Sequence, residues 1–167
     1  MTEFIYIGFW VAMAFVYGGL SEWALHKYVL HGLGKRKSSI FSFHWHSHHK
    51  ICRKNKNRDD NYLSWPPAPP VRKEILALFL LVWAHIIFLF IQPYFFGGLI
   101  VYTVRYFYMH RKAHTNIEWC KKNIPWHYDH HMGKDQDANY GVTVEWPDKL
   151  FGTRVIHREG HMSEGEN

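Results

Sequence analysis

The chain has few cysteines and lacks the commonest zinc motifs. Its two cysteines, Cys52 and Cys120, form no CXXC pair, so a thiolate zinc ribbon is excluded. An HEXXH helix is also missing, which argues against a zinc peptidase. Both cysteines fall in a region that the charge pattern below predicts to be cytosolic, where a disulfide is not expected.

Charged side chains are absent from two long stretches. Residues 4–21 carry none, and neither do residues 75–104. Both stretches are long enough to enter a bilayer. Pro93 divides the second one, so we expect two helices of about 17 residues, 75–91 and 94–110, which either cross the membrane or form a re-entrant hairpin.

Basic residues are absent from the first part of the chain, because all twenty Lys and Arg lie at or after Lys27. The stretch 4–21 therefore lacks the basic region of a signal peptide, and we expect it to be a retained span. Since Lys and Arg favour the cytosolic side, the N-terminus is predicted to lie outside. An integral, multi-pass membrane location follows. The basic runs fit anionic lipid headgroups better than nucleic acid, and no nucleic-acid partner is expected.

Histidine is the metal-binding residue that the chain has in abundance. Of its fourteen histidines, eleven lie in four clusters, and ten of these make the spacings HX4H, HX3HH, HX3H and HX2HH, with His46 inside the second. The clusters span residues 26–31, 44–49, 110–114 and 127–131. One ion seldom takes more than about six ligands, so ten clustered imidazoles indicate two ions that share a site. The predicted topology places all four clusters on the cytosolic side, as a common centre requires.

Helical spacing predicts how the clusters point. A four-residue spacing puts two histidines on one helix face, and the pairs are His110 with His114 and His44 with His48. The fourth cluster also makes one face. His26 and His31, five residues apart, point about 140° away from each other on an ideal helix. They would reach different ions, or the helix would loosen near its end.

The other histidines have simpler interpretations. His85 lies inside an apolar helix, where a hydrogen-bonded packing role is more common than a metal-binding one. His157 and His161 are expected to be solvated. His46 interrupts the second cluster, and its neighbours fit ligand spacing better.

The predicted fold is all-α: an integral membrane helical bundle with a helical cap on its cytosolic face that carries a di-metal site. Residues 1–157 are expected to form a single domain, and residues 158–167 a disordered tail. The other predicted elements are helices over 4–31 and 38–50, an extended connector over 65–70, a helix from Pro125 that carries the fourth cluster, and turns over 139–153.

The ligand type narrows the choice of metal. All-imidazole ligation with few carboxylates suits iron, copper or zinc. Zinc sites usually take three or four ligands, whereas about five imidazoles for each ion fit iron with an open position for dioxygen. Such a centre would attack an unactivated C–H bond, and lipid tails lie within reach of the predicted site.

The four clusters, in this order and context, resemble those of the membrane-bound fatty acid hydroxylase superfamily, which includes fatty acid 2-hydroxylases, sterol desaturases and carotenoid hydroxylases. Three flanking segments agree as well: His26 to Gly32 (HKYVLHG), Asn61 to Pro67 (NYLSWPP) and Asn139 to Thr153 (NYGVTVEWPDKLFGT). The second cluster departs from the 2-hydroxylase pattern HX2HH, which leaves either His44 or His46 as a ligand.

The resemblance implies a histidine-ligated centre of two iron ions, with zinc as a substitute, and O2 as co-substrate. The same ten residues would be ligands and catalytic residues: His26, His31, His44, His48, His49, His110, His114, His127, His130 and His131. No HPGG haem motif occurs in the sequence, so electrons are expected from a separate donor of the cytochrome b5 or ferredoxin type.

The resulting hypothesis is a membrane-bound, non-haem di-iron oxygenase that hydroxylates a lipid or fatty acyl chain. One alternative is a carotenoid or sterol hydroxylase or desaturase. HKYVLHG favours the carotenoid branch, and the HX3H third cluster and the ending of the segment 139–153 disfavour it. A different class is a membrane zinc hydrolase or metal-handling protein. Asp129, Asn139 and Asp148 either orient metal-bound rings or cap turns.

Overall fold

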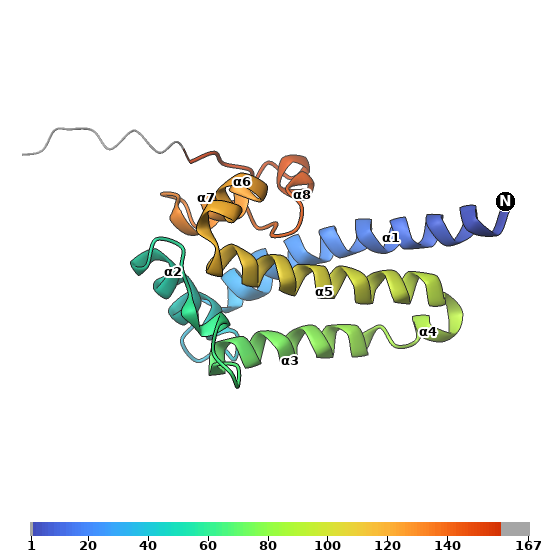
Figure 1. The fold of residues 1–167 in the computed structure, drawn as a ribbon, viewed down its shortest axis with the longest axis horizontal. Helices are drawn as coiled ribbons and strands as arrows, with labels where there is room; N and C mark the ends of the chain where they lie inside the picture. Colours follow the sequence, from blue (N-terminus) through green and yellow to red (C-terminus); the bar gives the residue numbers. More distant parts are fainter. Residues whose placement is uncertain (1, 158–167) are drawn as a thin grey trace, which may run out of the picture.

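Three long helices run side by side in the computed structural model of the protein, which describes residues 2–157 (Figure 1). They are α1 (Thr2–Ala24), α3 (Pro69–Ala84) and α5 (Pro93–Thr115). The described part of the chain contains helices and no strand, which confirms the predicted all-α class. The predicted tail at 158–167 lies outside the described residues.

Shorter elements surround this bundle. Three of them, α2, α6 and α7, gather at the end opposite the N-terminus, whereas α4 lies at the other end (Figure 1). The short elements are the π-helices η1 (Leu25–Leu33) and η2 (His44–His49), α2 (Lys50–Lys54), the 3-10 turn η3 (Asp60–Tyr62), α4 (Phe88–Ile91), α6 (Ile117–Asn123), α7 (Pro125–Met132) and α8 (Trp146–Leu150).

Prolines begin three of the helices. The break predicted at Pro93 is confirmed, and α7 begins at Pro125 as expected. The connector predicted over 65–70 is two residues too long, because Pro69 and Pro70 occupy the first helical positions of α3. A proline is tolerated there, since the first N–H groups of a helix have no intrahelical partner.

Two other boundaries differ from the prediction. Residues 38–41 form turns, so the helical segment that carries the second cluster begins after them rather than at residue 38. The segment 139–153, predicted as turns, contains the short helix α8. Both differences concern about one helical turn, the range in which sequence signals and hydrogen-bonded boundaries commonly disagree.

Small residues let α1 and α5 pack closely. A Cβ atom added at Gly98 would lie 2.7 Å from the Cβ of Ala14. One added at Gly18 would lie 2.6 Å from the Tyr102 ring. Both distances are too short for real atoms, so these glycines are needed where the helices touch. The two glycines therefore give α1 and α5 a close-packing face.

One helical segment, Thr2–Leu33, is long and apolar enough to cross a membrane by length and composition. Its large side chains point outward: Phe4 is 81% exposed and Ile5 67%. Helix α3 also exposes apolar side chains such as Phe79 and Trp83. Exposed apolar surface of this extent indicates association with lipid or protein, and the multi-pass topology stays a prediction.

Candidate metal centre

All ten histidines that were predicted to be ligands are buried, and they converge at the end of the bundle where α2 contacts α7 and η1 contacts η2. Five of them form what we call the first histidine group, in which the ligand atoms lie within 4.8 Å of one another. This group comprises His26, His31, His44, His49 and His130. Residues from η1, η2 and α7, distant in sequence, thus surround one point.

The second histidine group lies beside the first. Four of its members, His110, His114, His127 and His131, also have ligand atoms within 4.8 Å of one another. His48 completes it, because its ring lies 5.0 Å from that of His110 and 4.6 Å from that of His114, between centroids. The groups touch where the rings of His49 and His131 lie 4.4 Å apart.

The two π-helices decide how the histidines are divided. In a π-helix, residues five apart lie nearly above one another, because the hydrogen bonds run from i to i+5. His26 and His31 therefore share the first group, which settles the open alternative in favour of a loosened helix. His44 shares that group with His49, also five residues on.

Two predicted pairings are wrong as a result. His44 and His48 were expected to face one ion, yet they lie in different groups because η2 is a π-helix. The fourth cluster was expected to form one face, yet the regular turn of α7 sends His130 to the first group and His127 with His131 to the second. The pairing of His110 with His114 is as predicted.

Oxygen atoms orient the histidine rings of the first group. The Nδ1–H of His26 donates to Tyr140 O at 2.5 Å, and that of His130 donates to Ala138 O at 2.6 Å. His49 Nδ1–H donates to Gln136 Oε1 at 3.1 Å. A neutral imidazole carries one proton, so the Nε2 atom of each of these rings is a bare acceptor.

Bare acceptors face one another inside the first group. His130 Nε2 lies 3.1 Å from His49 Nε2, and no proton is available between them. His31 Nε2 also lies close to His49 Nε2, at 3.2 Å. Bonds of about 2.1 Å to one ion, at right angles, would place neighbouring nitrogens roughly 3 Å apart. The residues therefore fit a bound metal ion, which would relieve the repulsion of the lone pairs.

The second group has the same design. The Nδ1–H of His114 donates to Asn57 O at 2.9 Å, and its Nε2 lies 3.1 Å from His127 Nε2. Within residues 2–157, the Nε2 atoms of His48 and His110 are buried without a hydrogen-bond partner. Buried nitrogens without partners are costly unless a ligand satisfies them. This group thus also fits an ion.

Burial keeps these rings neutral. Removal from water lowers the pKa of His44, His49, His130 and His131 well below the usual histidine value. Neighbouring histidines lower the pKa of each ring further. A neutral imidazole can donate its lone pair to a metal near pH 7, so the site needs no large proton loss to bind one.

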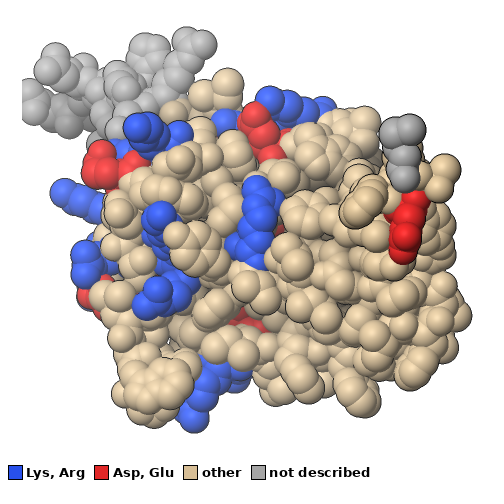
Figure 2. All heavy atoms as spheres, turned by 45° about the vertical axis from the view of Figure 1, so that its right-hand side comes forward, with Lys and Arg blue, Asp and Glu red and all other residues tan. Residues whose placement is uncertain are grey.

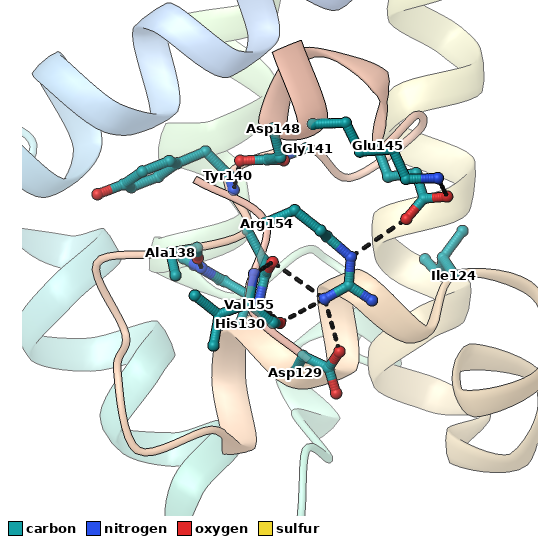
Figure 3. A network of polar contacts seen from close by, with 12 residues as sticks. Ile124, Asp129, His130, Ala138, Tyr140, Gly141, Glu145, Asp148, Arg154 and Val155 are labelled. Carbon is teal, nitrogen blue, oxygen red and sulfur yellow. Dashed lines mark hydrogen bonds and ion pairs between the residues drawn. The ribbon is translucent and has the colours of Figure 1, made fainter. Parts of the chain in front are cut away.

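The segment 138–155 holds part of this arrangement in place (Figure 3). The Asp148 carboxylate accepts from Tyr140 N at 2.9 Å and Gly141 N at 2.7 Å. Arg154 donates to Asp129 Oδ2 at 2.8 Å and to Glu145 Oε2 at 3.1 Å. The loop so fixed presents the carbonyls of Tyr140 and Ala138 to His26 and His130.

Asp129, Asn139 and Asp148 have the turn-holding role rather than direct contact with rings. Asp129 pairs with Arg154, and Asn139 accepts from Val155 N at 2.8 Å. The sequence analysis did not predict the carboxylate and amide side chains that contact the histidine rings. They are Asp59, Glu74, Gln136 and Asp137. They come from three segments outside the clusters, so no spacing pattern could have found them.

His46 and His85 lie outside both groups. His46 is exposed and contacts Lys35 O at 2.9 Å. The second cluster therefore contributes His44 and not His46 to the buried groups. His85 Nε2 lies 2.8 Å from Tyr17 Oη, which agrees with the predicted packing role. His157 is in neither group, and His161 lies outside the described residues.

Cys52 lies beside the second group but is disfavoured as a metal ligand. Its Sγ lies 3.4 Å from His114 Nδ1 and 3.8 Å from His48 Nδ1, so the four residues His48, Cys52, His114 and His131 are close enough for a metal. The Nδ1 atoms, however, already donate to Asn57 and Asp59. Burial also raises the pKa of the Cys52 thiol well above its usual range, which disfavours the thiolate.

An apolar groove leads from the bundle to both groups. Its volume is about 680 Å³, and side chains from α1, α3 and α5 line it. His26 and His44 from the first group and His48 and His110 from the second form its inner end. The groove therefore connects the three long helices to the centre.

Comparison with known proteins agrees with this architecture. A ceramide very long chain fatty acid hydroxylase of Schizosaccharomyces pombe, scs7, is 28% identical over 177 residues, which cover 94% of this chain and 47% of that protein. The chain thus spans about half the length of this curated relative. No solved structure matches the present chain. The sequence matches the fatty acid hydroxylase family over residues 11–153. The chain therefore belongs to the fatty acid hydroxylase family.

Proposed function

We propose that the chain is a membrane-bound, non-haem di-iron oxygenase that hydroxylates a lipid or fatty acyl chain with O2 and electrons from a separate donor. The observation that carries this proposal is the convergence of ten buried histidines in two groups at the inner end of an apolar groove. The ten histidines are the proposed ligands. Membership of the fatty acid hydroxylase family supports lipid hydroxylation as the reaction.

Bound iron would supply O2 activation and the abstraction of hydrogen from a C–H bond. The chain's own residues supply the rest. Oxygen atoms on the Nδ1 side hold seven of the ten rings so that their lone pairs face inward. The groove walls, with side chains such as Leu25, Leu81 and Leu99, exclude water from the substrate.

The dimensions of the groove fit one acyl chain. Along α1 it extends from His26 to Tyr17, nine residues or roughly 13 Å at 1.5 Å per residue. Along α3 its lining runs from Pro70 to His85, and the part from Glu74, which contacts His110, to His85 is roughly 16 Å long by the same measure. One leaflet of a bilayer core is about 15 Å deep. A lipid tail could therefore lie in the groove with its reacting carbon beside the histidines.

The charge distribution supports the proposed orientation and electron supply. Lys and Arg gather around the histidine end, whereas the opposite end is nearly free of charge (Figure 2). The histidine end would then lie on the cytosolic side under the positive-inside rule. A separate electron-donor protein with an acidic surface would meet a basic surface at the histidine end.

The decisive experiment uses iron-replete expression in a membrane host. We expect about two irons per chain, and hydroxylated lipid that appears only when O2 and a reductant system are both supplied. Lipid extracts from cells with and without the protein, compared by mass spectrometry, would identify the product. Two zinc ions with no iron, and no oxygenated lipid, would instead favour the membrane zinc protein.

The far end of the groove should control chain length. Tyr17 and His85 bridge α1 and α3 there, through the 2.8 Å contact between Tyr17 Oη and His85 Nε2. Replacing both by alanine opens this end, so we expect a shift of several carbons toward longer substrates. Competition between acyl chains of different length would measure it. Tyr17→Phe keeps the ring and should leave the preference nearly unchanged, and an equal shift in that variant would contradict the steric explanation.

A further inference from the structure

The two histidine groups differ in the charge that stands behind their rings. In the second group, His48 Nδ1–H donates to Asp59 Oδ2 at 3.1 Å. His110 Nδ1–H donates to Glu74 Oε1 at 2.6 Å. The Asp59 side chain is 1% exposed and that of Glu74 11%, so both carboxylates are shielded from water. Two negative charges therefore stand directly behind two proposed ligands.

Hydrogen bonds hold both carboxylates in place, and their ion-pair partners are histidine rings. Asp59 Oδ1 accepts from Asn61 N at 3.1 Å, and Glu74 Oε2 accepts from Tyr62 Oη at 2.5 Å. Within residues 2–157, the ion pairs of these two carboxylates are with histidine alone and not with lysine or arginine. Their charge is thus uncompensated unless a cation lies beyond the imidazoles.

The first group is held mainly by neutral oxygens. His26 and His130 donate to backbone carbonyls, and His49 donates to the amide of Gln136. Its one carboxylate, Asp137, contacts His31 Nδ1 at 3.2 Å but is 45% exposed and also pairs with Lys35. Water and the ammonium group screen this charge.

From this difference, which rests on the proposed function, we infer that the two metal positions are inequivalent and that the second group binds its ion more tightly. A carboxylate behind a ligating imidazole makes the ring more basic and a stronger donor. Two unscreened negative charges also attract a cation strongly at low dielectric constant. The second group should therefore fill first when metal is scarce.

The position of the first group supports the same order. His49 lines a second hollow, of about 570 Å³, together with Lys50, Arg53 and Gln136. This hollow is polar and open toward solvent, so the first group lies next to a route for exchange. The ion of the first group should accordingly be the more labile of the two.

The test is a titration of the metal-free full chain in detergent with Zn²⁺, in competition with a chromophoric chelator. We expect two steps whose affinities differ by at least about tenfold. Glu74→Gln should weaken the tighter step by about 10- to 100-fold, because the neutral amide keeps the shape and loses the charge. Asp137→Asn, the matched change in the first group, should alter the weaker step by less than about tenfold.

Two histidine variants assign the steps to the groups. His127→Ala should weaken the tighter step, and His26→Ala the weaker one. Two equal steps, or a tighter step lost in His26→Ala, would overturn the inference, provided that circular dichroism shows each variant to be folded. Failure of the proposed function looks different: both steps would remain while the iron-loaded protein hydroxylates no lipid.

Discussion

Replacing His114 by alanine is expected to abolish lipid hydroxylation and to lower the metal content from two ions per chain toward one. His114 is fully buried, and its Nε2 lies 3.1 Å from His127 Nε2 in the second group. Loss of a partner behind a ligand typically costs 10–100-fold in metal affinity or activity, so loss of a ligand should cost more than about 100-fold. Metal analysis and product formation measure the two effects.

His46→Ala is the matched control for this variant. His46 belongs to a histidine cluster but is exposed, and it contacts only the Lys35 carbonyl among the described hydrogen bonds. Its removal should leave both metal content and activity within about twofold of the unchanged protein, since surface substitutions are usually within about 0.5 kcal/mol. Normal activity in His114→Ala, or loss in His46→Ala, would contradict the site assignment.

Glu22→Ala is expected to destabilise the whole fold. The Glu22 carboxylate on α1 accepts from Val142 N and from Thr143 N at 2.9 Å, and also from Tyr102 Oη at 2.8 Å. It thereby ties the C-terminal loop and α5 to α1. Each buried donor left without a partner costs about 1–3 kcal/mol, so two orphaned amides alone should cost about 2–6 kcal/mol.

Thermal unfolding in detergent, followed by circular dichroism, measures this loss. Glu22→Gln should recover much of it, because the amide oxygen still accepts hydrogen bonds from the loop. Glu118→Ala removes an exposed glutamate and should leave the unfolding temperature nearly unchanged. A Glu22→Ala protein as stable as Glu118→Ala would show that the loop is held mainly by other contacts, such as those of Asp148.

The sequence alone determined which residues could form the centre and where they would gather. Charge-free runs predicted the long helices, and Pro93 and Pro125 located two of their starts. The cluster spacings predicted ten histidines at one site, and the structure brings those ten together. These features are local: helix formation, proline breaks and apolar stretches depend on neighbouring residues.

Only the tertiary structure decided how the ten histidines divide and what stands behind them. Whether His44 pairs with His48 or with His49 depends on a π-helix, and the spacing fits either an α-helix or a π-helix. Glu74 reaches His110 across 36 residues, and the carbonyl of Tyr140 reaches His26 across 114. Such contacts follow from how helices and loops pack, since a backbone carbonyl carries no sequence signal and a single carboxylate gives no pattern to recognise.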